Sequence, residues 1–333
     1  MKKFGGLFLM VFLAIIGIPA FITSIVGENK INQPMVKSKM DDINENKMII
    51  RVLDEKTGKT NNIEFEDYIK GVLAAEMPAL FEIEALKAQA VAARTYAVKK
   101  MDKNKDNVAD ISTEPSKGQA YLSIDELKEK WGENFYTYYE KITRAVEDTK
   151  GQVMFYEEEP IEAVFHSTSA GMTQSAKDVW QADVPYLQSV ESDGDKQAPA
   201  FEEEKKIKKE DVIEILLTRY PDIIIQDLVG QIQIVERSSG GYIKYIQIGN
   251  KILTGEEARE IFKLKSSAFI LKEEGENIIF ATKGYGHGAG MSQYGANYMA
   301  KEGRTYKEIL NHYYNGIIIK EIKDYDENIL NDE

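Results

Sequence analysis

The sequence predicts an α+β protein: an N-terminal transmembrane helix followed by one mixed domain with a central alanine-rich helix and a β-rich second half. Three observations lead to this prediction. An uncharged, mostly apolar run occupies residues 4–26, six alanines recur within the helical pattern of residues 83–100, and most predicted strands fall after residue 150. With 43% hydrophobic and 10% aromatic residues, the bulk of the chain should fold as a globular protein.

The N-terminal run is long enough to cross a membrane. Lys2 and Lys3 precede the apolar stretch Phe4–Val26, which at 1.5 Å per residue spans a hydrocarbon core of about 30 Å. The flanking lysines favour an N-terminus in the cytoplasm, so everything after residue 27 would lie outside it. A cleaved signal peptide is the alternative, but no clear small-x-small cleavage site follows the run. We therefore expect a single-pass anchor.

Composition excludes several classes of function. The chain has 55 acidic and 42 basic residues and a net charge of -13, which disfavours nucleic acid as a partner. It has no cysteine, which excludes disulfides, thiolate zinc sites and a cysteine nucleophile. The composition and periodicity divide the chain into an anchor (1–27), a polar linker (28–46), a folded domain (47–322) and a polar tail (323–333).

Hydrophobic periodicity and turn residues place the elements of the folded domain. Strands are expected at Met48–Leu53, Gln152–Tyr156, Ile161–His166, Leu228–Glu236, Tyr242–Ile248 and Asn277–Thr282. Helices are expected at Glu66–Met77, Ile83–Lys100, Ile124–Lys130, Glu210–Arg219, Gly255–Phe262, Ser292–Lys301 and Tyr306–Asn315. The charged stretch Gly194–Lys209 should be weakly ordered and should mark a boundary between a helical first half and a β-rich second half.

Glu76 is the first candidate for chemistry. Pro78 disfavours a helical residue before it, so the helix that begins near Glu66 should end by Met77. Glu76 would then lie at a helix C-terminus, where the macrodipole disfavours a carboxylate and raises its affinity for a proton. That is the direction a general acid needs. A surface glutamate at a helix end is the alternative reading, and Glu84, in the first turn of the next helix, is its main rival.

Two further segments combine a histidine with small and polar residues. Phe165–Leu187 carries His166 into a Ser/Thr/Gly turn, but it lacks a nucleophile elbow and a second ligand at zinc spacing. Gly284–Tyr294 places four glycines around His287, a pattern that permits close approach of the backbone to a ligand; a tight glycine-rich turn is the alternative. The segment lacks the Gly-Lys-Ser/Thr ending of a phosphate loop. Ser292 should N-cap the helix that follows.

Together these segments resemble the stage II sporulation protein D family of peptidoglycan lytic transglycosylases. The resembling stretches are VLAAEMPALF and EALKAQAVAARTYA (72–97), HSTSAGMTQSAKDVW and PYLQSV (166–190), and GYGHGAGMSQYGANYMA with YKEILNHYYNG (284–316). Their order, their spacing and the single anchor fit the family, and the resemblance covers roughly residues 47 to 322.

The resemblance implies a specific reaction. Members of the family cleave the β-1,4 bond between N-acetylmuramic acid and N-acetylglucosamine and leave a 1,6-anhydro end, with Glu76 at the position of the acid/base. Since no water is consumed, a second carboxylate is not required. Motif matching places the following residues along a glycan groove: Arg94, Tyr96, His166, Ser167, His287, Gln293 and Tyr294. Some relatives carry metal-binding cysteines near the His-Ser motif; this chain has Met172 and Asp178 there, so we expect no zinc and no other cofactor.

The resemblance also implies a cellular setting. The protein would lie in the mother-cell membrane, with its catalytic domain facing the engulfed forespore, and would act on glycan strands stripped of stem peptides by an amidase, the stage II sporulation protein P. The membrane protein stage II sporulation protein M would be a further partner. The alternative is a non-catalytic glycan-binding scaffold that positions an amidase. A zinc peptidase would need metal ligands that the sequence does not supply.

Overall fold

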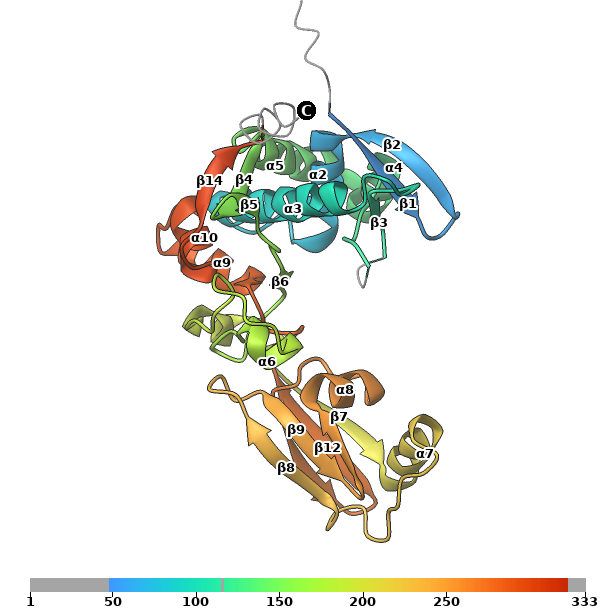
Figure 1. Cartoon of the computed structure of the whole chain (residues 1–333). Helices are drawn as coiled ribbons and strands as arrows, with labels where there is room; N and C mark the ends of the chain where they lie inside the picture. Colours follow the sequence, from blue (N-terminus) through green and yellow to red (C-terminus); the bar gives the residue numbers. More distant parts are fainter. Residues whose placement is uncertain (1–47, 115–116, 323–333) are drawn as a thin grey trace, which may run out of the picture. The chain divides into compact units, whose positions relative to one another are not determined.

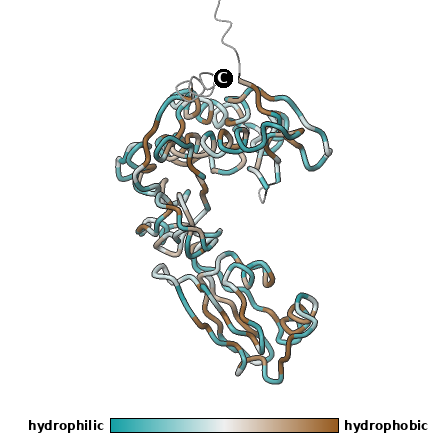
Figure 2. Tube along the Cα trace, in the orientation of Figure 1, coloured by the Kyte–Doolittle hydropathy of each residue, from teal (hydrophilic) through white to brown (hydrophobic). Residues whose placement is uncertain are grey.

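The computed structural model describes residues 48–114 and 117–322 (Figure 1). The described chain is a mixed α+β fold with two hydrophobic cores, in agreement with the predicted class. The first core gathers residues from 50 to 187 and from 291 to 317, and the second gathers residues from 212 to 280. Hydrophobic segments run through the strands of both cores (Figure 2). The second core is thus an insertion into the chain of the first.

Helix α3 (Ile83–Lys103) is the centre of the first core. The elements that pack against it are α2 (Phe65–Glu76), α5 (Phe135–Glu147), α9 (Gln293–Lys301), α10 (Tyr306–Tyr313) and strand β4 (Gln152–Tyr156). The six alanines of α3 are fully buried, and their small side chains let neighbouring backbones approach on several sides. The predicted central alanine-rich helix is therefore confirmed.

Three small sheets complete the first core. An antiparallel pair and a short parallel strand form the sheet β2 (Lys59–Glu64), β1 (Ile49–Asp54) and β3 (Ile111–Ser112). A second sheet has the order β14 (Ile318–Glu321), β4, β5 (Glu159–Pro160). The third pairs β6 (Phe165–His166) in parallel with β13 (Met291–Ser292), with Ser292 opposite His166. This last pair brings two segments far apart in the sequence side by side. The remaining helical segments of this part are α4 (Ile124–Trp131), η1 (Gly132–Asn134) and α6 (Ala176–Trp180).

The second core is built from two antiparallel sheets and two helices. One sheet has the order β11 (Phe269–Glu274), β12 (Asn277–Lys283), β7 (Glu202–Lys208), and the other β10 (Lys251–Thr254), β9 (Ile243–Ile248), β8 (Ile232–Arg237). Helices α7 (Lys209–Arg219) and α8 (Gly255–Ile261) pack against them. The predicted β-rich second half corresponds to this insertion.

The stretch Gly194–Lys209 is ordered, contrary to the prediction. It contains most of the 3-10 turn η2 (Asp193–Gln197) and all of β7, which pairs with β12 along its whole length. Its charged side chains point outward and pair across the sheet: Glu202 with Lys283 at 3.3 Å and Glu204 with Lys272 at 3.6 Å. Ion pairs across the sheet let an edge strand tolerate a run of charged residues. The same run of charges lacks the hydrophobic alternation typical of a strand, so β7 was not predicted from the sequence.

None of the described helices is long and apolar enough to cross a membrane. The predicted anchor (1–27) and linker (28–46) and the predicted tail from residue 323 lie outside the described residues.

Arg94 fixes the packing of α2 on α3. Its side chain is 0% exposed, and its Nη2 lies 2.7 Å from Oε2 of Glu66 on α2. Further hydrogen bonds reach the carbonyl oxygens of Gln152 and Val146 at 3.3 and 3.4 Å. Glu66 in turn accepts a hydrogen bond from the N–H of Gly151 at 3.1 Å. One buried ion pair therefore joins two helices to the start of β4.

We expect Arg94→Ala to lower the free energy of unfolding by about 3–5 kcal/mol, because it removes a fully buried guanidinium and leaves the partly buried Glu66 carboxylate without its cation. Denaturant unfolding followed by circular dichroism measures this loss. Lys99→Ala is the matched control: Lys99 forms an exposed pair with Glu159 at 3.2 Å, and its loss should cost less than about 1 kcal/mol. Equal effects of the two substitutions would contradict the structural role of Arg94.

Candidate active site around Glu76

Glu76 is the last residue of α2 and carries a largely buried carboxyl group. The helix ends there because Met77, the residue before Pro78, is extended (φ -126°, ψ 140°). Burial raises the pKa of Glu76, and a hydrogen bond from the N–H of Ala120 opposes that rise. Oε1 accepts this hydrogen bond at 3.0 Å, and no cation pairs with Glu76 within residues 48–114 and 117–322. The desolvated carboxyl group is therefore biased toward its protonated form.

The segment that supports Glu76 was not predicted from the sequence. Gln119 precedes Ala120, is buried, and accepts a hydrogen bond from the hydroxyl of Tyr68 at 3.3 Å. Tyr68 stacks on Tyr121, with ring centroids 5.5 Å apart. The Nε2 atom of Gln119 is buried and has no partner in the described part of the chain. The run Gly118–Tyr121 has no local pattern that would predict its position beside Glu76.

The rival carboxylate, Glu84, has structural partners. Its Oε1 lies 3.0 Å from Nζ of Lys87, and its Oε2 accepts the backbone N–H of Tyr306 at 2.8 Å. Tyr306 is the first residue of α10, so Glu84 fixes the start of that helix on α3. The geometry favours Glu76 over Glu84 as the acid.

Helix α9 connects the loop after Glu76 to the histidine segment. The ring of Tyr294 meets the ring of Phe81 edge to face, with centroids 4.9 Å apart, and its N–H donates to the carbonyl oxygen of Ser167 at 3.1 Å. Gln293 contacts the buried Gln89 of α3, Nε2 to Oε1, at 3.5 Å. Ser292 N-caps the helix as predicted, accepting from the N–H of Gly295. All three sequence motifs are thus linked through the first turn of α9.

His166 and His287 form a neutral pair with opposite tautomers. The carbonyl oxygen of Ala289 accepts from His166 Nδ1 at 3.0 Å, so that nitrogen carries the hydrogen. The N–H of Ala289 donates to His287 Nδ1 at 3.1 Å, which leaves the hydrogen of His287 on Nε2. The ring centroids are 5.7 Å apart. One residue, Ala289, therefore sets both tautomers.

Burial keeps both imidazoles uncharged. It lowers the pKa of His166 to about 3, with His287 as a smaller cause, and lowers the pKa of His287 to about 4. The Nε2 atom of His166 is buried and has no partner among the described residues. Since Nδ1 carries the hydrogen, this Nε2 is an acceptor, able to take a hydrogen bond from a hydroxyl or amide N–H.

The glycines around His287 serve close packing within the protein. A Cβ on Gly290 would lie 2.0 Å from the carbonyl oxygen of Val164, and one on Gly286 would lie 2.8 Å from Cβ of His166. Both glycines have positive φ, 70° and 112°. The glycines were expected to let the backbone come close to a ligand. In the structure they let it come close to β6 and its flanking residues.

Asp195 is a buried carboxylate that the sequence did not reveal. It is 0% exposed and accepts hydrogen bonds from the N–H of Ser169 at 2.9 Å and from Oγ of Ser292 at 2.6 Å. Burial raises its pKa, and hydrogen bonds from Ser169, Ser292 and Ser192 oppose that rise. Asp195 ties the turn after His166 to the cap of α9.

The remaining residues predicted to line a glycan groove differ in their burial and in their contacts. Arg94 is buried against Glu66, so we assign it a structural role in place of the predicted groove contact. Tyr96 is half-buried, with Nζ of Lys100 4.8 Å from its ring centroid. Ser167 is partly exposed and contacts the hydroxyl of Thr168 at 3.3 Å. Glu76 and His287 share no hydrogen bond or ion pair; Tyr294 contacts Phe81, in the loop after Glu76, and Ser167, next to His166.

The described residues do not fit a zinc site of the kind some relatives are expected to hold. Within residues 48–114 and 117–322, no group of three His, Asp or Glu side chains is arranged to hold a metal ion. We derive no step through a metal.

Fold and site together define an α+β protein with a largely buried carboxyl group on Glu76, which has no cation partner in the described residues, and a neutral pair of histidines. Residues 53–156, which include both Glu76 and Ala120, match the family model described as Stage II sporulation protein. The chain is 39% identical over 305 residues to the Stage II sporulation protein D of Bacillus amyloliquefaciens, covering 89% of this chain and 83% of that one. It is 41% identical over 269 residues to the protein of the same name from Bacillus subtilis, covering 78% and 75%.

The chain therefore belongs to the stage II sporulation protein D family, and it is a sporulation protein. A more distant relative is the protein named Amidase enhancer of Bacillus subtilis, 29% identical over 297 residues, which cover 74% of this chain and 39% of that protein.

We expect Glu76→Gln to stabilise the protein at neutral pH. A carboxyl group whose pKa is raised on folding costs stability once it ionises, and this cost builds up as the pH rises from its ordinary value of 4.5 through the raised pKa. Gln removes the charge and can still accept from the N–H of Ala120. The melting temperature should rise by about 1–3 °C at pH 7 and should be unchanged near pH 4.

Glu84→Gln is the matched control, because it weakens the pair with Lys87 and should lower the melting temperature at pH 7. If Glu76→Gln also lowered the melting temperature, or changed it equally at pH 4 and pH 7, the carboxyl group of Glu76 would not be desolvated as described.

Proposed function

We propose that this protein is a lytic transglycosylase that cleaves peptidoglycan strands lacking stem peptides, between N-acetylmuramic acid and N-acetylglucosamine, during engulfment. The observation that carries the proposal is the lone carboxyl group of Glu76, largely buried, with a raised pKa and no cation beside it in the described residues. A general acid has to hold its proton at the working pH, and this environment favours that state.

One carboxyl group suffices for the proposed reaction. Protonated Glu76 gives its proton to the glycosidic oxygen as the bond from that oxygen to the anomeric carbon breaks. The resulting carboxylate then takes the proton of the muramic C6 hydroxyl, whose oxygen bonds to the anomeric carbon, and the acid is restored. No water enters, so the second carboxylate of ordinary glycosidases is not needed. The N–H of Ala120 holds Oε1, which leaves Oε2 as the atom to carry the proton.

The neutral histidine pair supports binding of an uncharged sugar. Neutral imidazoles present one donor and one acceptor each, and the buried Nε2 of His166 is an acceptor without a partner among the described residues. In this proposal His166, Ser167, His287, Gln293 and Tyr294 bind the strand beside Glu76, and Tyr96 lines the same groove.

The cellular setting is part of the proposal. We propose that residues 1–27 anchor the chain in the mother-cell membrane and that the folded domain faces the forespore. An amidase that removes stem peptides, the stage II sporulation protein P, would supply the substrate, with the membrane protein M of the same stage as a further partner. Membership of a sporulation family supports this setting.

A scaffold that positions an amidase is the second candidate function. The name of one relative, Amidase enhancer, favours it. In that case the chain would bind glycan strands and stimulate an amidase without cutting, and the raised pKa of Glu76 would have no chemical use.

Product identity distinguishes these functions. We expect the full chain in detergent to convert purified glycan strands lacking stem peptides into fragments with 1,6-anhydro ends, identified by mass spectrometry. Glu76→Gln should reduce the rate by at least about a hundredfold, in the range of a lost general acid, while Glu84→Gln remains active. Reducing ends made by water would indicate a hydrolase, and strands bound but uncut by the wild-type chain would favour the scaffold.

The rate should depend on pH through Glu76. Because the acid has to be protonated, kcat/KM should be constant at low pH and fall about tenfold per pH unit above the raised pKa of Glu76. The pKa values of His166 and His287, about 3 and about 4, should add no step between pH 5 and pH 8. A rate that rises with pH in this range would mean that Glu76 acts as an ionised group.

A further inference from the structure

Trp180 is a large apolar side chain left exposed beside the histidine pair. Its side chain is 46% exposed, and its ring centroid lies 5.3 Å from that of His287 at an interplanar angle of 53°. Together with His166, these rings form a row that runs from the surface into the protein. Neither the sequence prediction nor the proposed groove uses Trp180.

The short helix that carries Trp180 is held at both ends. Ser175 N-caps α6, accepting from the N–H of Asp178 at 3.1 Å and donating to Oδ2 of Asp178 at 2.8 Å. Gln181 ends the helix in the left-handed conformation, with φ 58°. A Trp fixed in this way loses little conformational freedom when a ligand stacks on it, and exposed indole rings bind apolar sugar faces at low entropic cost.

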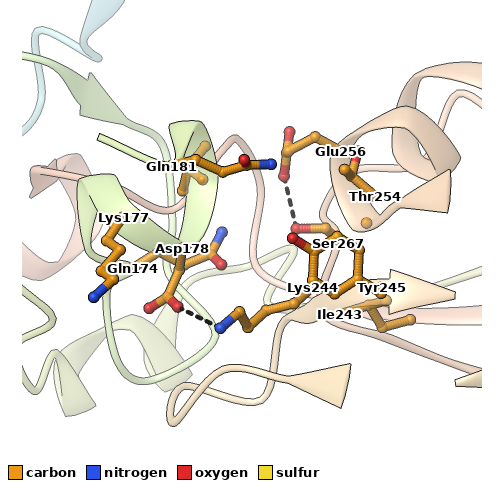
Figure 3. Close-up of a pocket in the computed structure, with 12 residues that line it drawn as sticks. Gln174, Lys177, Asp178, Gln181, Ile243, Lys244, Tyr245, Thr254, Glu256 and Ser267 are labelled. Carbon is orange, nitrogen blue, oxygen red and sulfur yellow. Dashed lines mark hydrogen bonds and ion pairs between the residues drawn. The ribbon is translucent and has the colours of Figure 1, made fainter. Parts of the chain in front are cut away.

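A polar cavity of about 210 Å³ opens next to the same helix. Its walls come from α6 on one side and from β9 and α8 on the other (Figure 3), and its polar lining includes Gln174, Lys177, Gln181, Lys244, Glu256 and Ser267. Gln174 also donates through Nε2 to the carbonyl oxygen of His287 at 2.7 Å. Gln174 therefore lines the cavity and also contacts the backbone of His287, the residue whose ring meets Trp180.

The charges of the cavity are largely matched, which favours an uncharged ligand. Lys244 lies 3.4 Å from Asp178 and 2.8 Å from Glu236. Glu256 accepts from the hydroxyl of Ser267 at 2.7 Å and pairs with Arg259 at 2.8 Å. Such a lining presents amide, hydroxyl, ammonium and carboxylate groups without a strong net charge. Hydroxyl and acetamido groups of a sugar can both donate and accept, and they fit a lining of this kind.

From this geometry we propose that Trp180 and the adjoining cavity form a sugar subsite that takes one N-acetylhexosamine unit of a glycan strand. Trp180 stacks on the apolar face of the sugar ring, and the cavity, with Gln181 at its rim, receives the polar substituents. The identity of the strand rests on the proposed function, but binding at this subsite does not require cleavage.

The subsite implies a preference for long strands. Trp180 and the residues that line the cavity make no hydrogen bond, ion pair or ring contact with Glu76, so we take the sugar bound here to be a different one from the sugar being cut. Only a strand long enough to reach both Glu76 and the Trp180 subsite gains binding energy from both sites. Loss of Trp180 should therefore raise KM for long strands and leave kcat unchanged, because stacking at a remote sugar adds binding equally before and during the reaction.

The fluorescence of Trp180 provides a direct readout. The chain has two tryptophans, and the other, Trp131, is half-buried and packs against Phe135 and Tyr138. In the full chain carrying Glu76→Gln to prevent cleavage, Trp131→Phe leaves Trp180 as the sole reporter. Titration with N-acetylglucosamine oligomers and with glycan strands lacking stem peptides should then give a saturable change in emission. Trp180→Phe in place of Trp131→Phe should abolish that change.

Affinity variants test the energetic contribution. Trp180→Ala should weaken strand binding by about tenfold, which is roughly the contribution of ring stacking. Gln181→Ala should weaken it by about a few-fold, which is roughly the contribution of a single hydrogen bond. Tyr136→Ala is the matched control: Tyr136 is 82% exposed on α5 and should leave affinity unchanged. Circular dichroism checks that each variant is folded.

The outcomes separate this proposal from the proposed function. If strands bind and are cut but neither Trp180 emission nor the Trp180→Ala affinity changes, the subsite is wrong and the transglycosylase stands. If strands bind at Trp180 and the wild-type chain leaves them uncut, the subsite stands and the scaffold function replaces the enzyme. If no glycan changes Trp180 emission while an amidase partner does, Trp180 lies in a protein interface and the sugar subsite is overturned.

Discussion

The small side chains on helix α3 are the constraint on which the first core depends. Four helices and strand β4 make the main contacts with α3, and they can do so because half of its buried positions are alanine. The N–H of Glu82, the residue before α3, donates to Oδ1 of Asn297 on α9, and Gln89 of α3 contacts Gln293 at the start of α9. A larger residue on this surface would separate the candidate acid from the motif that links it to the histidines.

The glycine segment lies where the chain returns from the inserted core to the first. Tyr285 and Thr168 exchange backbone hydrogen bonds at 2.7 and 3.0 Å, and the N–H of Gly284 donates to the carbonyl oxygen of Phe201 at 2.8 Å. Tyr242, from the inserted core, packs beneath Gly288 and accepts from the N–H of Ala170 at 2.8 Å. Side chains on these glycines would collide with backbone or with Tyr242, so the same residues that shape the histidine pair also join the insertion to the first core.

Local patterns predicted the parts of the fold and site that depend on neighbours in sequence. The end of α2 before Pro78, the buried alanine helix and the Ser292 cap are all set within a few residues, and each is found as predicted. What the sequence could not supply are pairings across long separations. Ala120 meets Glu76 over 44 residues, and Asp195 meets Ser292 over 97. Nothing in the charged stretch around Asp195 distinguishes it from the solvated acids beside it, and motif matching alone could not tell that Arg94 points at Glu66.

The pairing of Arg94 bears indirectly on the chemistry of Glu76. A buried guanidinium beside a carboxylate would favour its ionised form and lower its pKa, which would suit a nucleophile or a base and would oppose an acid. Arg94, the one fully buried arginine in the described part of the chain, is instead bound to Glu66 through Nε and Nη2. Glu76 is left with a single backbone N–H. Arg94 thus pairs with Glu66 at the start of α2, and no cation in the described residues pairs with Glu76 at the end of the same helix, where the proposed reaction requires a protonated group.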